Sequence, residues 1–150
     1  MKNFIFAFIL FALLLTVNAA PFKLNKRSTS FVPWGRGYDT LKVSITPDPP
    51  VSEKDEKYDV SGTLTRLNIT KDKSFLKFMY TGLNYYVIYF YTSTFNESYK
   101  VGDPFSVSAN VPTPQLPDSY YIFVTVGDPI NLLNTYASAF AKVTGSSNFL

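Results

Sequence analysis

The sequence predicts an all-β fold, a two-sheet antiparallel β-sandwich of about seven short strands. The first observation is that several segments alternate apolar and polar residues with the two-residue period of a half-buried strand. The second is that Pro, Gly, Asn and Asp separate these segments at short intervals, as turn residues do. A chain of 150 residues, 46% of them hydrophobic, is long enough to bury one core. We therefore expect a single domain.

The first predicted strand comprises residues 41–46 and ends abruptly. Its alternate residues share one apolar face, namely Leu41, Val43 and Ile45. The phrase that follows, Pro47-Asp48-Pro49-Pro50, removes three backbone donors, so no hydrogen-bonded ladder can continue through it. The strand must stop there.

Two more strands are predicted on either side of a polar turn. A charged loop over residues 51–57 precedes a strand over residues 58–67, and residues 68–73 form the turn after it. The next strand covers residues 74–80. One face of this strand carries Leu76, Phe78 and Tyr80, and the opposite face carries Phe75, Lys77 and Met79.

The most apolar segment after the N-terminal region is YYVIYFY, residues 85–91. It has β-branched and aromatic residues on both faces, so we expect it to be covered on both sides or to lie at an interface. Gly82 and Asn84 permit a bend or bulge before it. The pattern does not decide which of its faces points inward.

The last three predicted strands cover residues 105–111, 120–126 and 137–143. Two interpretations stay open for residues 128–136. Asp128 and Pro129 suit a helix cap and a first helical position, with Leu132-Leu133 facing the core. A long loop into the final strand is the alternative. In total the strands predict an immunoglobulin-like arrangement of two sheets.

Four short phrases occur in an order that is typical of one family. They are Pro47-Asp48-Pro49-Pro50, Ser61-Gly62-Thr63-Leu64, Lys100-Val101-Gly102-Asp103 and Leu116-Pro117-Asp118-Ser119-Tyr120. With these phrases, spread over residues 39–143, the chain resembles the ML domains. This secreted lipid-recognition family includes fungal phosphatidylglycerol/phosphatidylinositol transfer proteins and the Niemann-Pick type C sterol carrier. The resemblance implies a lipid cavity between the two sheets, and it favours the loop over residues 128–136.

The chain departs from that family because it contains no cysteine, whereas family members usually carry two or three disulfides. A domain of this length can bury a sufficient core without them. The resemblance therefore stands, but the covalent links that usually clamp the cavity are missing. Their absence predicts a slot that exchanges its ligand faster than in cross-linked relatives.

The first residues are typical of an export signal. Lys2, an apolar run over residues 4–17 and the site Val17-Asn18-Ala19 match the three parts of a secretory signal peptide. A membrane anchor is the alternative, but a spanning helix needs about 20 apolar residues. We assign residues 1–19 to the signal peptide and residues 28–150 to the ML-like domain. Residues 20–27, which end in Lys26-Arg27, are either a short propeptide or an ordinary polar tail.

Export predicts a secreted protein, or alternatively one in the vacuole or another endomembrane lumen. The net charge of +3 falls to +2 when Lys2 leaves with the signal peptide, and to −1 when a cut after Arg27 removes three further basic residues. The basic charge therefore gives little support to nucleic-acid binding, and we expect none. Two sequons in expected turns, at Asn68 and Asn96, are predicted glycosylation sites of an exported chain.

The residue types argue against catalysis. The chain contains neither His nor Cys, which excludes Ser-His-Asp and Cys-His mechanisms and the common zinc sites. A pair of carboxylates could still act as the catalytic groups of a glycosidase. However, most acids fall in predicted turns, where solvated Asp and Glu are common: Asp48, Glu53, Asp55, Glu56, Asp72, Asp103, Asp118 and Asp128. We expect no enzyme, no metal and no cofactor.

The chain is rich in aromatic residues, with 14 Phe, 11 Tyr and one Trp. They either fill the core or, as the family resemblance implies, wall a slot for a lipid. The candidate lining residues are Val43, Ile45, Leu64, Phe78, Tyr86, Ile88, Phe90, Phe105, Val107, Tyr120, Ile122 and Val124. Lys77, Lys100 and Arg66 are candidates to meet an anionic head group, or else are solvated surface charges.

Two functions are compatible with these observations. The first is a monomeric lipid-binding or lipid-transfer protein that holds a phospholipid or sterol between its sheets and touches membranes transiently. Each buried CH₂ contributes about 0.8 kcal/mol, so no catalytic group is needed for affinity. The second is an interaction module, an effector or adhesion domain, with a filled core.

Overall fold

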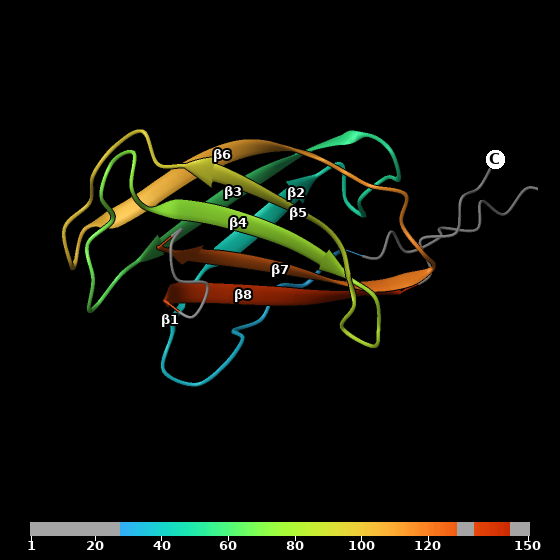
Figure 1. Cartoon of the computed structure of the whole chain (residues 1–150), viewed down its shortest axis with the longest axis horizontal. Helices are drawn as coiled ribbons and strands as arrows, with labels where there is room; N and C mark the ends of the chain where they lie inside the picture. Colours follow the sequence, from blue (N-terminus) through green and yellow to red (C-terminus); the bar gives the residue numbers. More distant parts are fainter. Residues whose placement is uncertain (1–27, 129–133, 145–150) are drawn as a thin grey trace, which may run out of the picture.

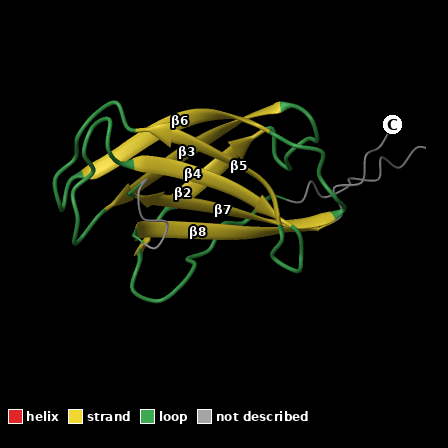
Figure 2. Cartoon of the chain, in the orientation of Figure 1, coloured by secondary structure: helices red, strands yellow, loops and turns green. Residues whose placement is uncertain are grey.

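The computed structural model describes residues 28–128 and 134–144. Within these ranges the chain forms eight strands in two sheets that pack face to face, so the predicted all-β sandwich is confirmed (Figure 1, Figure 2). This described part holds no helix able to cross a membrane. The predicted signal peptide, residues 1–19, and the segment 20–27 lie outside the described residues.

The larger sheet has five strands in the order β1-β8-β7-β4-β5. They are β1 (Asp39–Thr40), β4 (Phe75–Thr81), β5 (Val87–Thr94), β7 (Ser119–Gly127) and β8 (Thr135–Thr144). The smaller sheet has the order β2-β3-β6, with β2 (Lys42–Thr46), β3 (Asp55–Thr63) and β6 (Pro104–Pro112). Neighbouring strands are antiparallel except β1, which runs parallel to β8. The sequence did not predict β1, because two residues are too few to show a period.

The segment before β2 covers one edge of the five-stranded sheet. Val32 and Phe140 of β8 exchange two backbone hydrogen bonds of 2.9 Å, and β1 pairs with β8 further along. The carboxylate of Asp48 accepts hydrogen bonds from the amide of Thr29 at 2.9 and 3.0 Å and from its hydroxyl at 2.6 Å. The segment is thus tied to both sheets. The opposite edge is β5, which has no further strand beside it among the described residues.

The core lies between the sheets and is made by the inner faces of both. Its largest side chains without exposed surface are aromatic, Tyr58, Phe78, Tyr80 and Tyr120. Tyr58 of the smaller sheet packs on Phe78 of the larger one, with ring centroids 4.7 Å apart. Burial of aromatic rings on this scale is a large hydrophobic contribution to folding. These four rings therefore fill the core, which is the first of the two roles considered for the aromatic residues.

The charged loop predicted over residues 51–57 is partly strand, because β3 begins at Asp55. The ladder with β6 extends this far, where Asp55 stands opposite Pro112, and it ends at Thr63 rather than at residue 67. Beyond Thr63 no β6 residue remains to pair with, since β6 begins at Pro104. The partner strand, rather than local composition, fixes both ends of β3.

Strand β5 begins at Val87 rather than at Tyr85, because Tyr85 and Tyr86 belong to a turn. The amide of Gly82 donates a 3.0 Å hydrogen bond to the carbonyl of Tyr86. Tyr85 has a φ of 63°, which lies outside the range of strand residues. A bend was predicted before residues 85–91, and the turn provides it; the register of the β4–β5 pair shifts at Ile88, inside the segment predicted as strand.

Elsewhere the predicted strands agree with the structure to within a residue or two. β2 ends at Thr46, directly before the proline-rich phrase. β8 begins at Thr135, so residues 135–136 are strand rather than loop or helix. Residues 129–133, for which helix and loop were the alternatives, lie outside the described residues.

Candidate functional site

Most of the residues predicted to line a lipid slot face the space between the sheets, and apart from a hollow of about 150 Å³ beside Val107 they pack against one another. They belong to the core or pack against it: Val43, Ile45, Leu64, Phe78, Ile88, Phe105, Val107, Tyr120, Ile122 and Val124. Phe78 and Tyr120 have no exposed surface, whereas a space large enough for one water molecule beside them would expose part of each ring. The interior is therefore closely packed around these two rings.

The assignment of Tyr86 and Phe90 to the interior is wrong. Phe90 pairs with Met79 on the outer face of the five-stranded sheet, and 61% of Phe90 is exposed. Tyr86 lies in the turn with its ring over Gly82. The bulge at this turn lets the adjacent residues Ile88 and Tyr89 both pack against the core, which shifts the alternation and turns Phe90 outward.

Glu56 is buried, so its assignment as a solvated turn residue is wrong. Because β3 begins at Asp55, alternation places Glu56 on the same inner face as Tyr58. Its Oε1 accepts a 2.6 Å hydrogen bond from the amide of Val51, while its Oε2 has no hydrogen-bond partner among the described residues. Burial raises the pKa of Glu56 above its ordinary value, against the opposing effect of that hydrogen bond.

A short chain of hydroxyl groups lies in the core near Glu56. The hydroxyls of Tyr58 and Tyr80 are 2.8 Å apart, and that of Tyr80 is 3.4 Å from the hydroxyl of Thr113. Burial raises the pKa of both tyrosines, which keeps them neutral. The hydrogen bonds satisfy polar atoms that would otherwise cost free energy in the core. We assign this cluster a structural role.

A hollow with a volume of about 530 Å³ lies on the outer face of the five-stranded sheet, and we call it the outer hollow. Its walls come from β4, β5, the end of β7, the start of β8 and two residues between these last strands, Asp128 and Asn134. The residues from β4 and β5 are Phe75, Lys77, Met79, Val87, Phe90 and Thr92. The volume falls within the roughly 300–1,000 Å³ of small-molecule sites.

The strand register orders the outer hollow into rows across the sheet, and the first, with Phe75 beside Gly127, lies at the end that Asp128 borders. Thr92 of β5 and Thr125 of β7 stand on either side of Lys77, which makes a polar row. At the next outward position toward the β4–β5 turn, Phe90 stands beside Met79, which makes an apolar row. A ligand that combines a polar group with an apolar body matches this order.

Lys77 is the lysine of the outer hollow. Its burial among these side chains lowers its pKa, since burial disfavours the charged form. Among the described residues no carboxylate lies within 4.0 Å of its ammonium group. An anionic ligand would supply the missing partner with a charge-assisted hydrogen bond. The other two head-group candidates, Lys100 and Arg66, are exposed in the β5–β6 and β3–β4 loops and do not line the outer hollow.

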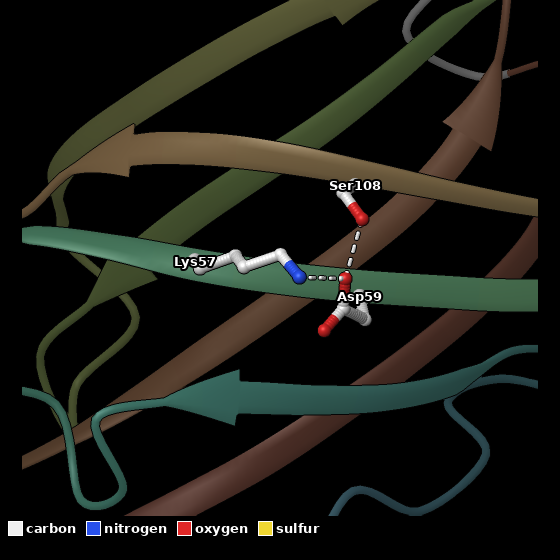
Figure 3. A network of polar contacts seen from close by, with 3 residues as sticks. All are labelled: Lys57, Asp59 and Ser108. Atoms are coloured by element: carbon white, nitrogen blue, oxygen red, sulfur yellow. Dashed lines mark hydrogen bonds and ion pairs between the residues drawn. The ribbon is translucent and has the colours of Figure 1, made fainter.

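The outer face of the three-stranded sheet has a different character (Figure 3). There Asp59 accepts a hydrogen bond from the hydroxyl of Ser108 on β6 and pairs with the ammonium of Lys57 at 3.1 Å. The bond from Ser108, followed by the contact with Lys57, lowers the pKa of Asp59. At this place the outer face of the smaller sheet pairs a cation with a carboxylate, whereas Lys77 of the larger sheet lies next to an apolar row.

The two sequons lie where glycans are sterically possible. Asn68 and Asn96 are exposed in the β3–β4 and β5–β6 loops. The two loops are joined by a pair of 2.9 Å backbone hydrogen bonds between Ile69 and Tyr99. The Oδ1 of Asn68 accepts a hydrogen bond from the amide of Val101, and its Nδ2 remains for attachment.

The outer hollow was not predicted from the sequence, although the alternation of residues separates the two faces of β4 correctly. The available signal was the outward set of that strand, in which Phe75 and Met79 stand on either side of Lys77. Two large apolar residues around one cation are unusual for a plain solvated face. Within the described residues, no group of three or more acidic side chains is placed to hold a metal ion.

Comparisons with known proteins do not name a family. No family model matches the chain, and no curated protein does. Among solved structures, a β-glucuronidase from glycoside hydrolase family 2 is 13% identical with a TM-score of 0.43, over 70% of this chain and 11% of that one. A Bacteroides uniformis β-glucuronidase is 17% identical with a TM-score of 0.40, over 79% of this chain and 14% of that one. The chain spans only a small part of these enzymes, and the similarity carries no information about its activity.

Proposed function

We propose that the protein is a non-enzymatic lipid-binding protein that holds an amphipathic, anionic lipid in the outer hollow. The observation that carries the proposal is the order of the hollow, with a lysine row next to an apolar row. The head group would meet Lys77 between two threonine hydroxyls. The acyl chain would lie along Met79 and Phe90.

The lipid would thus lie on the outside of one sheet rather than between the two sheets. The packed rings of Phe78 and Tyr120 leave no space for a ligand beside them. The hollow instead offers apolar surface that is already exposed, so binding would not require the sheets to separate. An acyl chain gains about 0.8 kcal/mol for each CH₂ it buries, which suits an open apolar wall.

Replacing Lys77 by methionine is expected to weaken binding of cis-parinaric acid, a fluorescent fatty acid, roughly tenfold, because a charge-assisted hydrogen bond is lost. Binding of the uncharged methyl ester is expected to stay unchanged. The measurement is fluorescence titration of the purified protein in the absence of membranes.

The matched control is Lys100→Met, which removes an exposed lysine of the β5–β6 loop that does not line the outer hollow. It is expected to bind the acid as the wild type does. The proposal fails when the folded wild type binds neither probe and organic extraction of the purified protein yields no lipid.

The second candidate function is a surface interaction module, and the closely packed core is what favours it. Such a module would recognise a partner without holding a small ligand. For such a module we expect no binding of either probe in the titration and no lipid in the organic extract.

A further inference from the structure

The turn between β4 and β5 exposes apolar side chains at one end of the sandwich, and we call residues 82–87 the aromatic turn. It projects from the end of the larger sheet at the lower right of Figure 1. Its exposed apolar residues are Leu83, Tyr85, Tyr86 and Val87. Isolated exposed apolar residues are common, but four within five consecutive positions mark an interaction site.

The aromatic turn holds its rings in place rather than letting them collapse onto the protein. The amide of Tyr85 donates a 2.9 Å hydrogen bond to the carbonyl of Gly82, which closes the turn. The ring of Tyr85 stacks on that of Tyr121, with centroids 5.3 Å apart and planes at 9°. This stacking fixes Tyr85 while most of its surface stays exposed.

The composition of the turn points to a lipid surface as its partner. From Gly82 to Asn96 the sequence contains no charged residue. Tyrosine is enriched at membrane interfaces, where the ring meets apolar chains and the hydroxyl meets water and head groups. Lys142 stands opposite Tyr121 in the β7–β8 ladder and is exposed, so a cation lies near the stacked ring. A cation at this place would attract anionic lipids.

We propose that the aromatic turn inserts into the interfacial layer of a lipid bilayer. This inference rests on the proposed function and names the partner from which the ligand comes. Val87 belongs both to the turn and to the wall of the outer hollow, and Phe90 continues that wall along β5. A lipid leaving the bilayer at the turn therefore reaches the apolar row without crossing a charged residue of β5. Lys77 lies two outward positions beyond Thr81 along β4 and receives the head group.

The test uses vesicles of phosphatidylcholine with a minority of phosphatidylglycerol, and co-flotation of the purified protein. The variant is Leu83→Glu/Tyr86→Glu, at residues that are 49% and 54% exposed and do not line the outer hollow. Its bound fraction is expected to fall about tenfold, because carboxylates are unfavourable in the interface. The matched control is Leu67→Glu/Val101→Glu, which adds the same charge at residues 48% and 45% exposed in the opposite loops. It is expected to float with vesicles as the wild type does.

The two proposals fail in different ways. The variant in the turn is expected to bind cis-parinaric acid in membrane-free solution with unchanged affinity, because the hollow is intact. If it floats as the wild type does, or if the wild type does not float, the membrane inference is overturned while the fatty-acid titration still decides the proposed function. Equal losses in the turn variant and the control also overturn it, since they would reflect charge alone. Leu83→Ser/Tyr86→Ser takes the place of the glutamate variant if circular dichroism shows that the latter is unfolded.

Discussion

Replacing Phe78 by alanine is expected to lower the free energy of unfolding by about 3–5 kcal/mol, because it leaves a cavity in a packed core. The ring of Phe78 has no exposed surface and packs against Tyr58 of the other sheet and Tyr91 of β5. Nothing beside it can collapse easily into the space, since the neighbouring rings are held by their own strands. Urea denaturation followed by far-UV circular dichroism measures the change.

The matched control for Phe78→Ala is Phe90→Ala, which removes the same side chain from the outer face of the neighbouring strand. Phe90 is mostly exposed, so the expected loss is about 0.5 kcal/mol or less. Similar losses for the two variants would show that the space between the sheets is not closely packed at Phe78. In that case a ligand slot between the sheets would again be the better hypothesis. The comparison thus tests whether the space between the sheets is filled at Phe78.

Glu56 is expected to make the protein less stable as the pH rises. Burial holds the pKa of Glu56 above its ordinary value of 4.5, so the folded protein binds this proton more tightly than the unfolded chain does. Its contribution to stability is therefore fully present below the unfolded pKa and is lost as the pH rises through the folded pKa. An ionised Glu56 leaves Oε2 buried without a hydrogen-bond partner among the described residues, at a cost on the order of 1–3 kcal/mol.

The variant Glu56→Gln is expected to remove this part of the pH dependence, because it cannot ionise. Melting temperatures of wild type and variant, measured between about pH 4 and pH 8, give their difference in stability over the range in which Glu56 ionises. The melting temperature of Glu56→Gln is expected to rise relative to that of the wild type toward neutral pH. Glu53→Gln, an exposed residue two positions outside β3, is the control and is expected to follow the wild type. Parallel curves for wild type and Glu56→Gln would contradict the burial of an ionisable carboxyl at this place.

The alternation of apolar and polar residues predicts most of the sheet strands, because one face of each is buried. β2, β4, β6 and β7 follow it closely. β5 does not, since its residues are apolar on both faces and a bulge interrupts its period. There the inward face depends on the turn at Tyr85, whose positive φ is not encoded by a glycine. β1 depends on pairing with β8, which is distant in sequence.

The candidate site was harder to predict than the fold. Glu56 lies in a run of charged residues that is typical of a loop, and only the pairing with β6 shows that it faces inward. The family resemblance directed attention to the inner faces, whereas the hollow lies outside. The alternation of Phe75, Lys77 and Met79 did predict that these three side chains share a face. It could not predict that β5 and β7 would wall that face into a concave site.

The hydrogen-bonded pair Ile69 and Tyr99 has a consequence for a glycosylated form of the chain. It holds the two sequon loops together at one end of the sandwich, while the aromatic turn lies at the opposite ends of β4 and β5. Sugars attached to Asn68 and Asn96 would therefore hydrate a single pole and leave the other bare. Such a form would be polar along its length, with the sugar-bearing pole in water and only the aromatic turn left to meet a lipid layer.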